Sequence, residues 1–159
     1  KTDVSSIKNK MLLKRADSAM AMVVHKTQAI AEHLPALTVL LEQFRNLEPN
    51  VAAVEHHNRT PLIIAAEVGN SEAVSHILKH PKIEANVCDK RGRTALLAAI
   101  WRKVDITGLI SSPRVEPNKA SGVQGWSPLH VCILKNNMDA LRKLVDNPNV
   151  QIGQHDNMG

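Results

Sequence analysis

Residues 60–66 of the chain read Thr-Pro-Leu-Ile-Ile-Ala-Ala, and this short stretch decides the fold because it returns twice. Residues 94–99 read Thr-Ala-Leu-Leu-Ala-Ala and residues 127–132 read Ser-Pro-Leu-His-Val-Cys, so the copies begin 34 and then 33 residues apart. A Pro, a basic or polar residue and a β-branched residue follow each copy, at 81–83, 113–115 and 148–150. Several marks that keep one register indicate a repeated supersecondary unit.

Each copy carries the chemistry of a helix start. Thr60 and Ser127 precede Pro, which is favoured at the first helical position because its missing N–H would have no partner there. The Ala pairs at 65–66 and 98–99 allow neighbouring helices to approach closely. Thirteen residues after Thr60, apolar residues begin to recur at i, i+1, i+4 and i+5, which predicts one face of a second helix. We therefore expect helix pairs that stack to bury a continuous core.

This pattern resembles the ankyrin repeat family. The resemblance covers about residues 56–159 and rests on three motifs, namely Ser127-Pro128-Leu129-His130, Thr60-Pro61-Leu62 with Ala65-Ala66, and Gly69-Asn70. It implies an all-α fold, an ankyrin-repeat solenoid of stacked antiparallel helix pairs joined by β-hairpin-like turns, with N-terminal capping helices. It also implies that His130 forms a hydrogen bond within the fold.

The middle unit departs from the family pattern. It has no Pro after Thr94 and no glycine between its two helices, where Arg102, Lys103 and Val104 cross a shortened turn. We expect a tighter or distorted bend there.

The repeat register divides the chain into five segments. We expect an N-terminal helix or the tail of a preceding helical region at 1–16, a degenerate ankyrin-like unit at 17–54, an ankyrin repeat at 55–92, a repeat with a shortened inter-helix turn at 93–125, and a last repeat at 126–159. Residues 156–159 match the turn at 89–92 that leads into a helix pair. We therefore expect a fragment of a larger regulatory or effector protein.

The composition is that of a globular chain with few rings. Of 159 residues, 43% are hydrophobic and 22% charged, with a formal charge of +5, which excludes a disordered or collagen-like protein. No apolar run approaches the ~18–20 residues that cross a bilayer. The aromatic residues are Phe44, Trp101 and Trp126, so the core must be built from Ala, Leu, Ile and Val.

Cys88 and Cys132 have apolar neighbours, and we expect both to be reduced and buried. Reduced cysteines favour an intracellular location, in the cytoplasm or nucleus, or in a host cytosol for a bacterial effector.

The sequence contains no motif of catalysis or metal binding. His76 and His80 lie one helical turn apart, but no third ligand is near them, and we expect both on the solvent-exposed face of a helix. A phosphate loop, a nucleophile elbow and His-Glu-x-x-His are all missing from the sequence. We expect no enzyme activity, no cofactor and no metal in this segment.

The resemblance implies a concave groove, lined by turn tips and exposed inner-helix positions, that binds a protein partner. Trp101 and Trp126 both fall on such positions, and the neighbouring arginines can hold a carboxylate or stack on the indole rings. Trp and Arg are the residues most often found as interface hot spots. The predicted partner-binding residues are Trp101, Trp126, Arg91, Arg93, Arg102, Lys90, Arg59, His57, Gln124 and Lys135.

Alternatives remain open for the tryptophans and for the ligand. Each tryptophan can instead pack on the neighbouring unit and expose only an edge. The leading hypothesis is a monomeric module within a longer chain that binds an acidic or mixed protein segment. The alternatives are recognition of an anionic ligand such as a nucleotide or nucleic acid, through indole stacking and basic contacts, or a substrate-recognition arm of a multidomain enzyme. A charge of only +5, with acidic residues interspersed, disfavours nucleic acid.

Overall fold

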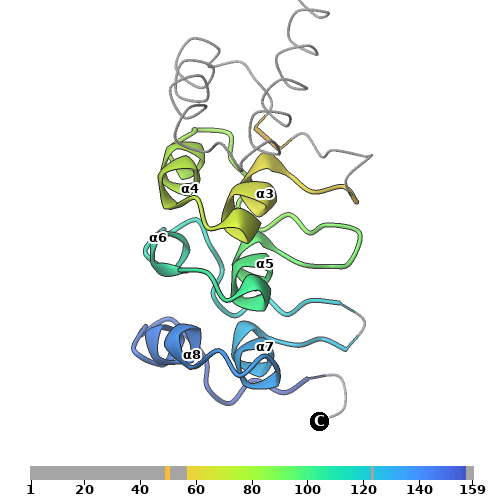
Figure 1. The fold of residues 1–159 in the computed structure, drawn as a ribbon. Helices are drawn as coiled ribbons and strands as arrows, with labels where there is room; N and C mark the ends of the chain where they lie inside the picture. Colours follow the sequence, from red (N-terminus) through yellow and green to blue (C-terminus); the bar gives the residue numbers. More distant parts are fainter. Residues whose placement is uncertain (1–48, 51–56, 123, 157–159) are drawn as a thin grey trace, which may run out of the picture.

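The described part of the protein is a stack of three helix pairs. The computed structural model describes residues 49–50, 57–122 and 124–156 (Figure 1). The first repeat pairs α3 (Pro61–Val68) with α4 (Ser71–Leu78), the middle repeat α5 (Ala95–Arg102) with α6 (Thr107–Ile110), and the last repeat α7 (Pro128–Leu134) with α8 (Met138–Val145). The helix expected at 1–16 and nearly all of the unit expected at 17–54 lie outside the described residues. The all-α solenoid predicted from the sequence is confirmed.

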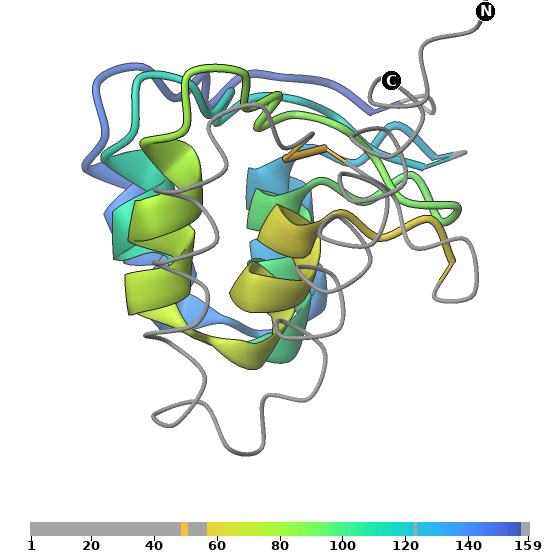
Figure 2. The same cartoon turned by 90° about the horizontal axis from the view of Figure 1, so that it is seen from above.

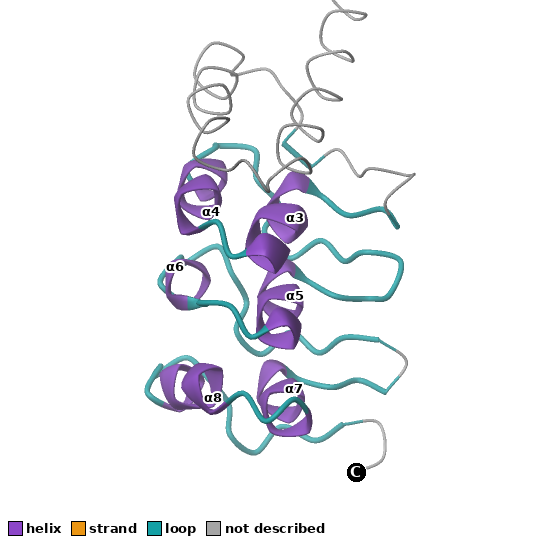
Figure 3. Cartoon of the chain, viewed as in Figure 1, coloured by secondary structure: helices purple, strands orange, loops and turns teal. Residues whose placement is uncertain are grey.

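The helices form two columns. Helices α3, α5 and α7 make one column and α4, α6 and α8 the other, and both views show the columns side by side (Figures 1 and 2). Loops that project past α3, α5 and α7 join one repeat to the next (Figure 3). Within the described ranges, an isolated antiparallel bridge between Ser121 and Trp126 gives one of these loops its hairpin character. None of the described helices has the length and apolar character that a membrane crossing requires.

Side-chain caps fix where the first helix of each repeat begins. The hydroxyls of Thr60 and Thr94 accept hydrogen bonds from the backbone N–H groups three residues later, at 3.3 Å in both repeats. Ser127 adds a second bond, because its own backbone N–H donates to Nδ1 of His130 at 3.2 Å. The predicted cap positions are confirmed, and His130 forms the internal hydrogen bond that the family resemblance implied.

The middle repeat makes the same left-handed bend as the first repeat without a glycine, and its turn is longer rather than shorter than the first, because four residues separate α5 from α6 and two separate α3 from α4. In the first repeat Gly69 takes the left-handed conformation with φ +77°, and a Cβ there would lie 3.1 Å from the side chain of Val104. Lys103 takes the corresponding place after α5, with φ +58°. A left-handed residue that is not glycine costs roughly 1–2 kcal/mol. Helix α6 then has four residues, whereas α4 and α8 have eight each.

Small residues bring the inner helices together. Ala65 and Ala66 of α3 and Ala98 and Ala99 of α5 are all buried, and α3 lies against α5 along more of its length than α5 lies against α7. Larger side chains such as Leu62, Leu96 and Ile77 fill the space between the columns. The core is therefore aliphatic, as the shortage of aromatic residues indicates.

An asparagine ladder, not foreseen from the sequence, joins consecutive repeats. Asn86 donates to the backbone C=O of Arg114 at 2.9 Å and accepts from the backbone N–H of Glu116 at 2.8 Å. Asn50 and Asn118 make the same pair of bonds to the repeats that follow them. The signal in the sequence is an Asn three residues after the β-branched residue of the Pro motif, as Asn86 and Asn118 follow Ile83 and Val115.

Two further sequence-based expectations are wrong. Cys88 is exposed rather than buried, whereas Cys132 is buried as expected. Apolar neighbours in the sequence do not fix burial here, because Cys88 lies in an extended arm where successive side chains face opposite sides. His80 is also buried rather than on an exposed helix face, because α4 ends at Leu78 and His80 lies beyond it.

Candidate partner-binding groove

The loops between repeats are joined into one continuous surface. Within the second hairpin, the backbone N–H of Asp89 donates to the C=O of Arg93 at 3.0 Å. The backbone N–H of Lys90 donates to the C=O of His57 in the preceding hairpin at 2.9 Å, and the Ser121 hydroxyl of the next hairpin likewise donates back to the C=O of Gly92. The hairpins are therefore held side by side, and we call the surface of their tips and the inner helices the groove, after the one that the family resemblance implies.

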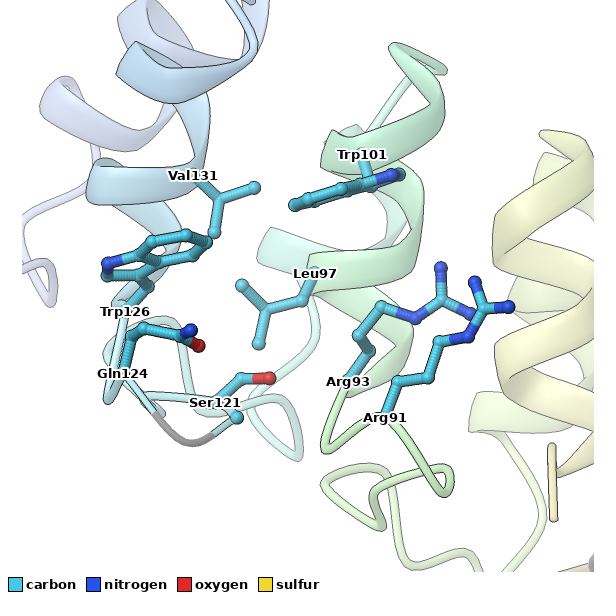
Figure 4. Close-up of a pocket in the computed structure, with 9 residues that line it drawn as sticks. Arg91, Arg93, Leu97, Trp101, Ser121, Gln124, Trp126 and Val131 are labelled. Carbon is cyan, nitrogen blue, oxygen red and sulfur yellow. The ribbon is translucent and has the colours of Figure 1, made fainter. Parts of the chain in front are cut away.

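We call the contact between the first and middle repeats the first seam, and that between the middle and last repeats the second seam. The groove side of the second seam contains a cavity of about 180 Å³. Its apolar walls come from two successive inner helices and from the hairpin between them (Figure 4). The lining residues are Arg91, Arg93, Leu97, Trp101, Ser121, Gly122, Gln124, Trp126 and Val131.

The two tryptophans lie on opposite sides of this cavity. Trp101 projects from the last turn of α5, and Trp126 stands on the hairpin arm that leads into α7 (Figure 4). Trp101 is 37% exposed, whereas Trp126 is half-buried and packs against the hydrophobic core. Trp126 therefore both packs on the repeat stack and lines the cavity, so the two interpretations drawn from the sequence are compatible.

A lysine covers the ring of Trp101. The Nζ atom of Lys135 lies 3.8 Å from the ring centroid, which is a cation–π contact. The sequence indicated arginines as the stacking partners of the indoles. Lys135 is the C-cap residue of α7, and Trp101 lies in the last turn of α5. The contact therefore joins the last repeat to the middle repeat across the second seam.

Glu67 gathers the arginines of the first seam. Its carboxylate lies 2.5 Å from Nη1 of Arg59, 3.8 Å from Nη1 of Arg93 and 3.7 Å from Nε of Arg102. The Glu67 side chain is only 12% exposed, so these attractions are screened by solvent less than those of an exposed pair. Three of the predicted partner-binding arginines are therefore already close to a carboxylate of the chain itself.

Asp89 holds the second hairpin together. Its Oδ1 accepts from the backbone N–H groups of Arg91 and Arg93, both at 2.9 Å. Its Oδ2 receives two bonds from the Arg93 guanidinium, at 2.8 and 3.0 Å. The Asp89 side chain has no solvent exposure. Arg93 is consequently a structural partner of Asp89 as well as part of the cavity wall.

The structure brings half of the predicted site residues to the cavity. Trp101, Trp126, Arg91, Arg93 and Gln124 line it. Outside the lining, Arg59 and Arg102 approach Glu67, Lys135 covers Trp101, and Lys90 and His57 meet through their backbones at the hairpin tips.

Sequence reasoning missed two kinds of site residue. Leu97 and Val131 were not named as site residues; both are buried, but each also presents a surface to the cavity. Glu67 and Asp89 were not recognised as partners of the arginines. The available signal was their position, since Asp89 begins the turn motif and Glu67 occupies the helix position that Trp101 has in the middle repeat.

The site is suited to contact rather than to proton transfer. Burial raises the pKa of the Cys132 thiol to about 11, which keeps it protonated at neutral pH. His130 is engaged in the helix cap. Across 49–50, 57–122 and 124–156, no three His, Cys, Asp or Glu side chains come close enough to hold a metal ion. What remains is an apolar cavity with polar and cationic groups at its rim.

Comparison with known families adds an independent finding. A family model described as ankyrin repeats (3 copies) matches residues 26–121, and a model described as an ankyrin repeat matches residues 124–154. The first match alone spans more than half of the 159 residues. A comparison with curated proteins gave no match.

Proposed function

The chain belongs to the ankyrin repeat family, whose repeats are generally protein–protein interaction modules, and on that premise we propose that it binds a partner protein through the groove of its middle and last repeats. The observation that carries the proposal is the convergence of Trp101 and Trp126 on one cavity at the second seam. Tryptophan is enriched among the hot spots of protein interfaces, because its side chain combines a large contact area with an indole N–H that can donate a hydrogen bond.

The nature of the cavity supports a protein ligand over a nucleotide. Sites for small molecules usually have volumes of ~300–1,000 Å³, and this cavity of about 180 Å³ is smaller. Three of the arginines that would contact a phosphate already lie near Glu67. Both features favour one side chain of a protein segment as the occupant of the cavity.

We also propose that the segment binds rather than catalyses, and that it works inside cells. The Cys132 thiol is buried with a raised pKa, and His130 is used in a cap, which leaves both poorly placed for nucleophilic chemistry. Cys88 and Cys132 are not joined in a disulfide, which agrees with a reducing compartment.

Affinity capture with matched variants tests this function. We would exchange both tryptophans for residues that the same positions carry in other repeats, in the double variant Trp101→Glu with Trp126→Arg. Each exchange is accepted by the repeat fold elsewhere in the chain, so circular dichroism should show unchanged helix content. Proteins captured by the wild type and lost by the double variant would be groove partners.

The control is Arg142→Ala, which removes an exposed cation from the outer helix α8. It should retain every groove partner. Equal capture by the wild type and the double tryptophan variant would contradict the proposed function.

A further inference from the structure

The cavity at the second seam has a shape and a chemistry that specify its ligand more closely than a general protein partner. We infer that it accepts a single apolar side chain of the partner, and that Arg91 at its rim binds a carboxylate adjacent to that side chain. This inference rests on the proposed function, since it describes what the same groove recognises.

The walls select an apolar side chain. Leu97 and Val131 are 2% and 4% exposed and form the inner surface, and Trp101 and Trp126 lie on either side (Figure 4). A charged group placed among them would lose its hydration without gaining a partner, which is costly. A volume of about 180 Å³ limits the occupant to about one side chain.

The rim of the cavity favours a negatively charged residue next to the apolar side chain of the partner. No acidic residue is among the cavity-lining residues. Of the two lining arginines, Arg93 donates from Nε and Nη2 to the buried Asp89, and its Nη1 lies 3.8 Å from Glu67. Arg91 is exposed and has no ion pair with the described residues, while its backbone N–H is fixed by Asp89 at 2.9 Å. Its backbone is therefore fixed, and its guanidinium is available to a carboxylate, which arginine can bind through two hydrogen bonds.

Two other groove cations have contacts within the chain. Arg102 approaches Glu67, and Lys135 covers Trp101. The sequence predicted an acidic or mixed protein segment as the partner. The structure instead favours one acidic residue next to one apolar residue, rather than a run of acidic residues.

Selection from a library of random twelve-residue peptides displayed on phage tests the inference, with the full 159-residue chain as the target. We expect enrichment of peptides in which an aliphatic or aromatic residue lies within two positions of Asp or Glu. Chosen peptides are then synthesised, and their affinities are measured by fluorescence anisotropy against the wild type, Arg91→Ala, Trp126→Arg and the control Arg142→Ala.

Combining a change in the protein with a change in the peptide identifies the contact between Arg91 and the peptide's acid. Arg91→Ala should weaken binding about tenfold, in line with a charge-assisted hydrogen bond, and so should exchange of the peptide's acid for its amide. Both together should weaken binding little more than either alone, because each removes the same contact. Trp126→Arg should weaken the same peptides at least as much, and Arg142→Ala should leave them unchanged.

Two other outcomes separate this inference from the proposed function. Peptides that depend on Trp126 but carry no acid, or that bind Arg91→Ala as tightly as the wild type, would overturn the inference and leave the function standing. Selected peptides whose affinity is indifferent to Trp126 would contradict both.

Discussion

The two seams of the repeat stack use the same backbone positions for different purposes. At the first seam the inner-helix position is Glu67 and the hairpin position is Arg93, and the two lie in a half-buried network with Arg59. At the second seam the corresponding residues are Trp101 and Trp126, and a cavity remains between them. The difference teaches that a groove position becomes structural when its neighbours supply the opposite charge, and stays available for a partner when they do not.

The seams also differ in how the repeats are held together. Helices α3 and α5 meet through alanines along much of their length, whereas α5 and α7 share less contact. On the side away from the hairpins, an exposed pair between Asp105 and Lys143 joins the middle and last repeats. We therefore expect substitutions in the first seam to affect stability, and those in the second seam to affect binding more.

The largest effect should come from Asp89→Ala, which removes the acid that organises the hairpin at the first seam. Arg93 would keep a guanidinium that is only 13% exposed and would lose the acid that receives its two hydrogen bonds. Breaking a buried pair in this way costs roughly 3 kcal/mol or more. Urea denaturation followed by circular dichroism measures the loss of unfolding free energy.

Asp89→Asn is the matched variant for this prediction. It keeps an oxygen that can accept hydrogen bonds from the backbone N–H groups of Arg91 and Arg93. Its loss of unfolding free energy should therefore be clearly smaller than that of Asp89→Ala. Equal losses in both variants would show that the charge of Asp89 matters more than its hydrogen bonds to the backbone. No loss in either would mean that the hairpin does not depend on Asp89 at all.

Glu67→Ala should have the next largest effect, because it opens the network of the first seam. Arg59 would lose a 2.5 Å partner, and Arg93 and Arg102 would lose a nearby negative charge. We expect a loss of about 1 kcal/mol in unfolding free energy, at the upper end of the range for partly exposed ion pairs. The control is Glu84→Ala, which removes an exposed glutamate from the arm after α4 and should change stability by less than about 0.5 kcal/mol. If both variants lose the same amount, the network at Glu67 contributes nothing specific.

Local chemistry explains which parts of the fold were predictable. The caps at Thr60, Thr94 and Ser127 depend on residues within one helical turn, so the sequence pattern predicts them directly. The missing glycine predicted a tighter or distorted bend, but Lys103 takes the same left-handed conformation as Gly69, with φ +58° against +77°. The exposure of Cys88 was mispredicted because it depends on the direction of an extended arm relative to the stack.

The candidate site was less predictable because it depends on pairings between repeats. The groove positions of Trp101 and Trp126 follow from the repeat register alone. That Glu67 approaches arginines from three places in the chain, and that Lys135 rather than an arginine covers Trp101, depends on how the repeats stack. Such contacts between residues far apart in the chain leave no periodic mark in a single sequence.

Removal of the Lys135 charge tests a smaller contribution to the second seam. Lys135→Met keeps most of the aliphatic stem but loses the ammonium group that lies over Trp101. We expect a loss of about 0.5 kcal/mol in unfolding free energy, since a cation–π contact at a partly exposed ring is weak. The contact is absent in Trp101→Ala, which introduces no new charge, so Lys135→Met should cost less in that background. Equal costs in the two backgrounds would mean that Lys135 does not act through the indole.

The smallest effect concerns the Asp105–Lys143 pair, whose contribution to stability should be lost in acid. The hydrogen bond from Lys143, with further bonds from Thr107, lowers the pKa of Asp105 from 3.8 to about 2. A lowered pKa in the folded state means that the contribution of Asp105 to stability is complete above about pH 4 and disappears as the pH falls towards 2. Both side chains are substantially exposed, so solvent screening keeps this contribution below about 1 kcal/mol.

Lys143→Met isolates the cause, because Lys143 makes the largest contribution to the shift. Carboxyl NMR titration should show the pKa of Asp105 rising from about 2 towards 3.8 in this variant, while the bonds from Thr107 keep part of the depression. Thermal unfolding of the wild type should lose its advantage over Lys143→Met between pH 4 and 2, because protonated Asp105 no longer attracts the lysine. An Asp105 that titrates at the same pH in both proteins would mean that the pair does not join the middle and last repeats in solution. The second seam would then be held by packing and by neutral hydrogen bonds such as the one from Asn137 to the C=O of Ile100, and its difference from the charged first seam would be larger still.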